Sequence, residues 1–248
     1  MNELKVIFEN DDVLVIDKPA GLLVHGEGGD ATGTVVDWFV SRVPSARGVG
    51  EPRVAQDGKE VERSGIVHRL DKDTSGVMIL VKNQSAFEHF KEQFHERLVK
   101  KEYRAIVYGL MKDKWGTIDR SIGRSSKDWR RRSAERGAKG KLRDAVTDWE
   151  SLKSGEVNGE NFSFLKLMPK TGRMHQLRVH LKAIDHPIVG DTVYSGKRLE
   201  QSANLGLKRL ALHALSLKII LPDGQEAVFT AELPPELKTA MESIAPVV

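Results

Sequence analysis

The stretch GIVHRLDKDTSGVMILV, residues 65–81, joins a dense cluster of polar side chains to an apolar run. Residues 76–81 are almost wholly apolar, which is typical of a buried strand. Ionisable and hydroxyl side chains crowd into residues 68–75, immediately before that strand. Functional groups often lie where a loop meets the end of a rigid element. The sequence therefore predicts a buried strand of a central sheet with a candidate site at its entrance.

Outward from this strand, the spacing of apolar residues predicts more strands than helices. The fold class is therefore α+β, with a mixed, largely antiparallel central sheet flanked by helices and a central cleft, in one domain over residues 1–248. The predicted strands are residues 6–8, 13–16, 76–81, 103–108, 145–152, 162–168, 210–221 and 227–230, and the predicted helices are residues 34–43, 86–98, 172–184 and a short one that opens at Pro234 and Pro235.

The helix predicted at residues 86–98 has an apolar face. Its spacing places four large side chains on one side, and they are more consistent with a core face than with a surface for base stacking. These side chains are Phe87, Phe90, Phe94 and Leu98. The connection at residues 44–61 is polar and contains glycine, so we expect a surface loop there.

Composition fits one large globular domain or two fused halves. Of the 248 residues, 40% are hydrophobic and 30% are charged, as in ordinary soluble proteins. There is no cysteine, which excludes disulfides and thiolate chemistry. The N-terminus has no signal-peptide pattern, and no apolar run approaches the roughly 18 residues of a membrane span. We therefore expect a cytoplasmic protein with no membrane association.

Positive charge gathers in residues 120–143. The chain has a net charge of +4, but this segment alone has ten Lys or Arg residues against two acidic ones. Such a basic stripe can neutralise phosphates, which makes a nucleic acid a candidate partner. Arg130, Arg131 and Arg132 lie at its centre and are predicted to contact that partner. The alternative is a solvated loop with no partner.

Three chemistries fit the carboxylates Asp71 and Asp73. An aspartyl-phosphate phosphatase uses an Asp-x-Asp pair, but such enzymes usually place Thr or Val where this chain has Ser75. A glycosidase needs two carboxylates that face one another about 5 Å apart or more, and residues two apart rarely do so. The third chemistry is a single carboxylate that acts on a nucleoside. A hydrogen-bonded turn without chemistry is the plainest alternative.

Residues 68–76, HRLDKDTSG, closely resemble the signature of the RluA-type pseudouridine synthases, in which the Asp at this place is catalytic. Further motifs of that family follow the same order along the chain. They are residues 17–21 (DKPAG) with Val24 and His25, residues 101–105 (KEYRA), residues 171–181 (TGRMHQLRVHL), Pro187 with Gly190 and Asp191, and residues 212–214 (LHA). The chain resembles short members of the family, which have no separate N-terminal S4-like domain.

The resemblance implies an isomerase, specifically an intramolecular transferase, that converts specific uridines of rRNA or tRNA to pseudouridine without a cofactor. It assigns catalytic roles to Asp71, Tyr103 and Arg173. Asp71 would act at the ribose, Arg173 would keep it charged, and Tyr103 would stack on the uracil and assist the final proton removal. Attack on C1′ and removal of a proton from C2′ both stay open. Because a paired uridine must be flipped out, Arg69 would fill the vacated space.

The same motifs supply further candidate contacts to the substrate. The full set of predicted substrate-binding residues is His68, Arg69, Thr74, Leu177, Arg178, Arg130, Arg131 and Arg132. Within it, Arg178 is the second candidate for a cation beside Asp71. Leu177 would pack beneath the base, although a leucine at helical spacing is more often core.

We expect no metal, because the spacings of the motif histidines match no zinc pattern. Those histidines are His68, His175, His180 and His186, which are expected to be structural or to contact RNA. The expected partner is structured RNA, bound in the central cleft, with no obligate protein partner and a monomeric chain. The alternative from another class is a non-catalytic RNA-binding protein that keeps the same fold.

Overall fold

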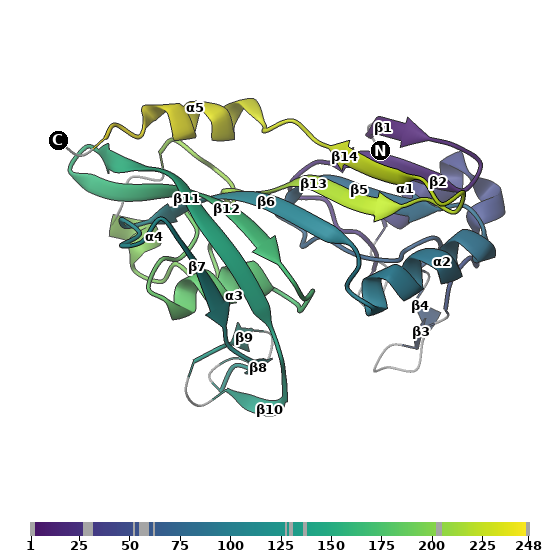
Figure 1. Cartoon of the computed structure of the whole chain (residues 1–248), viewed down its shortest axis with the longest axis horizontal. Helices are drawn as coiled ribbons and strands as arrows, with labels where there is room; N and C mark the ends of the chain where they lie inside the picture. Colours follow the sequence, from purple (N-terminus) through teal and green to yellow (C-terminus); the bar gives the residue numbers. More distant parts are fainter. Residues whose placement is uncertain are drawn as a thin grey trace. The chain divides into compact units, whose positions relative to one another are not determined.

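The computed structural model describes residues 3–26, 32–51, 53–54, 60–61, 63–126, 128, 131–135, 138–201 and 205–246. Its elements fall into two compact units (Figure 1). Unit 1 comprises Met1–Lys100 and Ala214–Glu232, and unit 2 comprises Lys101–His213 and Leu233–Val248. The strands β6 (Lys100–Tyr108) and β13 (Leu212–Ile220) carry the chain from one unit to the other.

Unit 1 is built on the buried strand that the sequence predicted. Strand β5 (Ser75–Val81) is buried along its whole length and pairs antiparallel with β2 (Val13–Lys18). On the other side of β2, β1 (Lys5–Glu9) forms an antiparallel hairpin with it, which confirms the strands predicted at residues 6–8 and 13–16. The strands predicted at residues 210–221 and 227–230 are also confirmed, because β14 (Glu226–Thr230) pairs antiparallel with β13.

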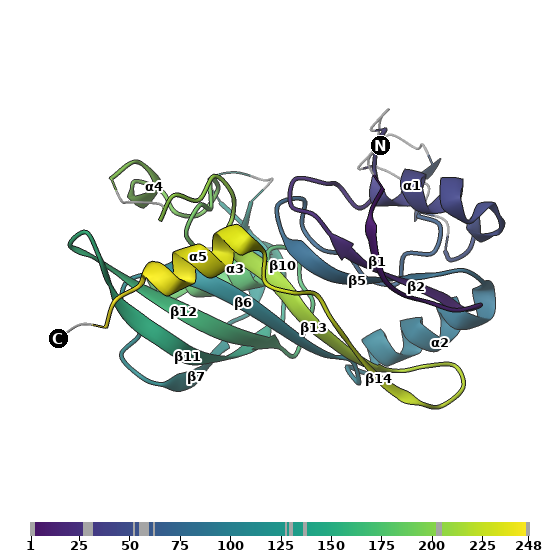
Figure 2. The same cartoon turned by 90° about the horizontal axis from the view of Figure 1, so that it is seen from above.

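Two helices cover the sheet of unit 1. Figure 2 shows α1 (Val35–Arg42) on one side of strands β1, β2 and β5 and α2 (Gln84–His95) on the other. Helix α1 begins at a capping box, in which the Thr34 side chain accepts from the Asp37 N–H and the Asp37 carboxylate accepts from the Thr34 N–H. The segment predicted as a loop after α1 contains a short 3-10 helix, Pro44–Ala46, and the two-residue strands β3 (Arg53–Val54) and β4 (Glu60–Val61).

The predicted apolar face of α2 is wrong at its C-terminal end. The helix ends at His95, so Leu98 lies beyond it with 57% of its surface exposed. Arg97 adopts a left-handed backbone with φ of 60°, and the Leu98 N–H donates to the Gln93 carbonyl at 2.9 Å. Gln93 is buried on this helix, and its amide exchanges two hydrogen bonds with the backbone of Ile220. The buried side of α2 therefore includes a hydrogen-bonded polar side chain that the apolar pattern did not predict.

Unit 2 has a second antiparallel run of strands. Its order is β6, β12 (Glu160–Pro169), β11 (Val146–Val157) and β7 (Trp115–Asp119). Helices α3 (Gln176–Ala183) and α5 (Pro235–Ser243) bury leucines against these strands in one core, which includes Leu177, Leu181 and Leu237. The short helix α4 covers Arg198–Gln201. Helix α3 begins four residues later than predicted, because residues 172 and 173 are irregular and His175 has a left-handed backbone with φ of 57°.

The basic segment forms a small sheet of its own, which the sequence did not predict. Strands β8 (Ile122–Arg124), β9 (Arg132–Ser133) and β10 (Lys139–Arg143) pair in the order β10, β8, β9. Every residue of β10 is exposed. Arg130 lies outside the described residues. We call these three strands the basic sheet.

The predicted fold class is confirmed: the chain is α+β, with a mixed, mostly antiparallel sheet. The domain boundaries 1–248 and the central RNA-binding cleft stay predictions. Within the described part of the chain, no helix combines the length and the hydropathy that crossing a membrane requires.

Candidate active site

Asp71 lies in a tight turn that leads into β5. The Thr74 N–H donates to the Asp71 carbonyl at 3.1 Å, which closes the turn. The Asp71 side chain is half-buried, Lys72 and Asp73 are exposed at the tip, and Thr74 is buried where the chain enters the strand. A carboxylate held this way is partly shielded from water and still accessible to a ligand.

Only glycine fits at position 76, at the start of β5. Its φ is +117°, and an added Cβ would lie 2.1 Å from the Ala214 carbonyl oxygen of β13. A side chain there would push the two strands apart. Gly76 therefore fixes how the chain leaves the Asp71 turn.

The fully buried Lys18 stabilises the turn that contains Asp71. Lys18, at the end of β2, has no exposed surface, and its ammonium donates to the carbonyls of Pro19 and Leu22 at 2.8 Å and of Lys72 at 3.0 Å. The Gly21 N–H also donates to the Lys72 carbonyl, at 2.9 Å. The lysine thus ties the loop after β2 to the residue that follows Asp71. It also places a buried positive charge against the backbone of this turn.

Replacing Lys18 with Met is expected to destabilise the protein by about 2–3 kcal/mol, because three carbonyl groups lose a charged donor. Urea unfolding followed by circular dichroism measures this loss. Lys5→Met is the matched control, since the Lys5 side chain on the neighbouring strand is 64% exposed and should change stability by less than about 0.5 kcal/mol. Equal effects of the two substitutions would contradict the assigned role of Lys18.

The two residues before Leu70 point to different partners. His68 accepts a hydrogen bond from the Ile79 N–H of β5 at 3.0 Å through Nε2, and its ring stacks on Phe94 at 4.9 Å. Arg69 is exposed, and one of its terminal nitrogens lies 2.8 Å from Nε2 of His25. The geometry gives His68 a structural contact and leaves Arg69 at the surface.

In unit 2, Arg173 is held at its backbone and at its side chain. Its N–H donates to the Gln176 side-chain oxygen at 3.0 Å, and its Nε donates to the Asp144 carbonyl at 3.1 Å. The Gln176 oxygen also accepts from the Thr171 hydroxyl at 2.7 Å, and its amide nitrogen donates to the carbonyl of Val146. Gln176 therefore fastens the Arg173 turn to the start of β11.

The network continues through a buried histidine. The Gln176 amide also donates to the Thr147 hydroxyl, which lies 3.0 Å from Nδ1 of His180. Nε2 of His180 lies 3.0 Å from the Arg120 carbonyl, which can only accept, so Nε2 carries the proton. Burial lowers the pKa of His180 below its ordinary value. The ring is therefore neutral at pH 7, and its two nitrogens are both satisfied.

This lowered pKa predicts a loss of stability in mild acid. The unfolded chain binds a proton at His180 near pH 6.5, whereas the folded chain resists it. The contribution of this shift to the free energy of unfolding is fully present above pH 6.5. It is lost as the pH falls towards the lower pKa of the folded state. Urea unfolding at pH 7.5 and 5.5 should show a smaller pH effect for His180→Gln than for the wild type. His95→Gln, at a side chain that is 83% exposed, should leave the pH effect unchanged; equal curves for His180→Gln and the wild type would contradict the prediction.

Arg178 makes a buried ion pair with Asp191. Its Nε and a terminal nitrogen donate to the two carboxylate oxygens at 2.7 and 2.9 Å. The guanidinium also lies 5.1 Å from the centre of the Tyr194 ring. Asp191 accepts two further hydrogen bonds, from the N–H groups of Val193 and Tyr194. This geometry makes Arg178 part of the framework of unit 2.

Tyr103 and Leu177 both contact the core of unit 2. Tyr103, on β6, is half-buried and packs against that core, opposite Leu167 of β12. Leu177, in the first turn of α3, is 7% exposed and belongs to the core itself. Asp71 is in unit 1, and Tyr103 and Arg173 are in unit 2.

The two remaining motif histidines have structural partners. His175 lies 2.9 Å from the Tyr194 hydroxyl, and His186 lies 2.9 Å from the Tyr108 carbonyl. The described residues contain no group of three His, Asp or Glu side chains arranged to hold a metal ion.

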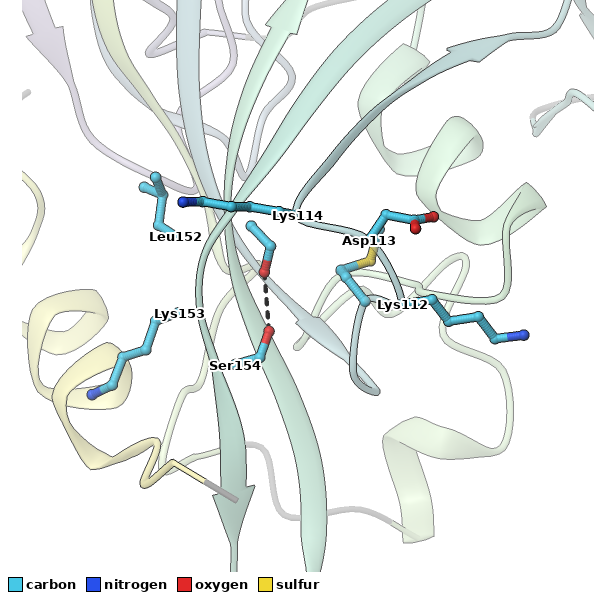
Figure 3. Close-up of a pocket in the computed structure, with 8 residues that line it drawn as sticks. Lys112, Asp113, Lys114, Leu152, Lys153 and Ser154 are labelled. Carbon is cyan, nitrogen blue, oxygen red and sulfur yellow. Dashed lines mark hydrogen bonds between the residues drawn. The ribbon is translucent and has the colours of Figure 1, made fainter. Parts of the chain in front are cut away.

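Unit 2 also has a pocket between the connection from β6 to β7 and the middle of β11, lined by Met111, Lys112, Asp113, Lys114, Ser151, Leu152, Lys153 and Ser154. Figure 3 shows Lys114 extending towards Leu152, while Lys112 points away from it. The hydroxyls of Ser151 and Ser154 lie 3.0 Å apart, and Lys153 donates to two carbonyls at the end of α5. The residues that line the pocket include none of the predicted site residues.

Sequence reasoning missed Lys18, Gln176 and Asp191 as residues that hold the site. Each stands inside a quoted motif, but its partner is distant or is a backbone group. Lys18 contacts a carbonyl 54 residues away. A charged residue at the end of an apolar strand, as at Lys18, is the one local signal that could have marked such a role.

The family is shown by comparison with known proteins. The family model described as RNA pseudouridylate synthase matches residues 12–183. The chain belongs to this family. It is 38% identical over 91% of its length to an uncharacterized RNA pseudouridine synthase of Synechocystis, and 37% identical over 97% of its length to the ribosomal large subunit pseudouridine synthase D of Xanthomonas campestris. The chain spans 64% and 69% of these two curated relatives, which is about two thirds of their length.

Solved structures agree with this membership of the pseudouridylate synthase family. The human RNA pseudouridylate synthase domain containing 1 protein matches 99% of this chain and 90% of its own, with a TM-score of 0.76 and 27% identity. The human domain containing 4 protein matches 98% of this chain and 95% of its own, with a TM-score of 0.69 and 26% identity. This family is the one that the motif at residues 68–76 resembles.

Proposed function

We propose that the protein isomerises specific uridines of a structured RNA to pseudouridine. One observation carries this proposal: the family match over residues 12–183 includes all three candidate catalytic residues, Asp71, Tyr103 and Arg173. The reaction breaks the bond from N1 to C1′, turns the uracil and joins C5 to C1′. It has no net redox change and no group donor, so these side chains can act without a cofactor.

Each residue has a separate task in this proposal. Asp71 supplies a carboxylate at the ribose, either to attack C1′ or to remove a proton from C2′. Arg173 keeps that carboxylate ionised, because a cation offsets the cost of burying a negative charge. Tyr103 stacks on the uracil and assists removal of the C5 proton. Arg69, at the surface of unit 1, fills the space that the flipped uridine leaves.

The candidate targets are rRNA and tRNA, and rRNA is the better supported. The relative from Xanthomonas campestris is named for the ribosomal large subunit, as is one from Nitrosomonas europaea. The uridine itself would be selected by the shape and flexibility of its surroundings as much as by base contacts.

The basic sheet is proposed to bind phosphates beside the reacting uridine. Strand β10 exposes Lys139, Lys141 and Arg143. The next residue, Asp144, accepts the hydrogen bond from Nε of Arg173, so the positive strand ends beside a candidate catalytic residue. Arg131 is also exposed and forms an ion pair with Asp128 at 3.4 Å, and phosphate contacts from Arg131 and Arg132 belong to the same proposal.

Changing Lys139, Lys141 and Arg143 together to Gln is expected to weaken RNA binding most at low salt. Each lost phosphate contact lowers the slope of log K against log salt by roughly one unit. Binding of a labelled rRNA fragment at several salt concentrations gives that slope. The control triple variant Lys112→Gln, Lys114→Gln and Lys238→Gln removes the same charge from exposed positions of unit 2. Equal slopes for the two variants would contradict a specific role for β10.

Release of tritium from RNA labelled at uridine C5 tests the proposed activity, because isomerisation replaces the hydrogen at C5. Purified protein should release tritium from a large-subunit rRNA or tRNA transcript without added nucleotide or reductant. Tight RNA binding without release from either class would favour the alternative, a non-catalytic RNA-binding protein with the same fold.

A further inference from the structure

His25 and Arg69 form a pair that joins two loops of unit 1. Nε2 of His25 lies 2.8 Å from a terminal nitrogen of Arg69, 44 residues further along the chain. His25 is 4% exposed, whereas Arg69 is at the surface. A buried ring therefore contacts an exposed cation just before the Asp71 turn.

The hydrogen bonds define the state of the His25 ring. Nδ1 lies 2.6 Å from the Gly26 carbonyl, which can only accept, so Nδ1 carries the proton. Nε2 is then free of a proton and accepts from the guanidinium, which can only donate. The imidazole must be neutral for both bonds to exist together.

The backbone that carries His25 is fixed on two sides. The N–H groups of Val35 and Val36, in the first turn of α1, donate to the carbonyls of Leu23 and Val24 at 2.9 and 3.0 Å. Further back, the Lys18 ammonium donates to the Leu22 carbonyl. The loop that carries His25 is therefore held in place by backbone hydrogen bonds, and its ring accepts the hydrogen bond from Arg69 without further ordering of the loop.

We propose that His25 is a positioning residue for Arg69, which it holds ready to enter the space left by the flipped uridine. This inference rests on the role proposed for Arg69. A free arginine carries about 2 kcal/mol of rotamer entropy, which it loses when it inserts. Because His25 already restricts the Arg69 side chain, part of this entropy is lost before the RNA binds. Base flipping is therefore favoured, whereas the chemistry at Asp71 is unaffected.

A double-mutant cycle tests the proposal. His25→Phe keeps a ring without an acceptor, His25→Gln keeps an acceptor, and Arg69→Met removes the donor. On a structured RNA, His25→Phe should lower kcat/KM by about threefold to tenfold, the range of one hydrogen bond, and His25→Gln should recover most of it. With an RNA in which the target uridine is unpaired, the loss should shrink. In the Arg69→Met background, His25→Phe should cause no further loss.

Losses that multiply in the double variant, or equal losses on the two RNAs, would overturn the proposal and make His25 an ordinary core residue. Thermal unfolding of each variant shows whether a loss comes from folding. If the wild type forms no pseudouridine, the proposed function fails instead. The imidazole ¹⁵N spectrum then tests the pair without activity: Arg69→Met should shift the His25 Nε2 resonance, and an unshifted resonance would overturn the pairing.

Discussion

Asp71→Asn is expected to abolish pseudouridine formation, with a loss of roughly a thousandfold or more. The amide has nearly the shape of the carboxylate, so the turn closed by Thr74 should persist. It can neither attack C1′ nor take a proton from C2′, so both possible routes lose their reacting group. Tritium release from RNA labelled at C5 measures the loss, with RNA binding measured in parallel to show that the substrate still docks.

Asp73→Asn is the matched control for this substitution. Asp73 lies two residues away in the same turn, is exposed and has the same charge. It should keep activity within a fewfold of the wild type. Activity retained by Asp71→Asn, or lost equally in both variants, would remove Asp71 from the centre of the mechanism.

Arg178→Met is expected to destabilise the protein by about 3–5 kcal/mol, the usual cost of breaking a buried ion pair. The Asp191 side chain has no exposed surface, and that of Arg178 is 6% exposed. Without the guanidinium, a buried carboxylate keeps two backbone donors but loses its counter-charge. Urea unfolding at pH 7.5 gives the change in free energy directly.

The double variant Arg178→Met and Asp191→Leu is the control, because it also removes the Asp191 carboxylate that the single variant leaves buried without a counter-charge. Removing both charges should recover part of the lost stability, because a buried ion pair is often no better than an apolar pair of similar volume. A loss of less than about 1 kcal/mol in the single variant would contradict the structural role assigned to this ion pair.

The elements that were predicted correctly are those whose pattern is local. Strands β1 and β2 follow from short apolar runs, the buried strand β5 from a longer one, and helix α1 from apolar residues at helical spacing. The ends of α2 and α3 were misjudged, because Leu98 satisfies a helical spacing but lies beyond the last turn of α2, and residues 172–175 precede the first turn of α3. The basic sheet escaped prediction because its strands are two to five residues long and almost without apolar side chains.

The candidate site divides in the same way. Residue types in sequence motifs were enough to nominate Asp71, Tyr103 and Arg173. The supports of these residues are contacts between distant segments, such as Lys18 with Lys72, Gln176 with Val146 and Arg178 with Asp191. The spacing of residues along the sequence does not predict which distant carbonyl or carboxylate a side chain contacts. The pairing of Arg178 with Asp191 is one such contact, which no pattern at residues 171–181 predicts.

A map of pseudouridine in total RNA tests the central claim most directly. Carbodiimide modification followed by primer extension would compare cells that have the wild-type gene, cells without it and cells that express only the Asp71→Asn protein. We predict that one defined site, or a small set, disappears in both altered strains and returns with the wild-type gene. An unchanged map in both strains would contradict the proposal that this chain is a pseudouridine synthase acting through Asp71.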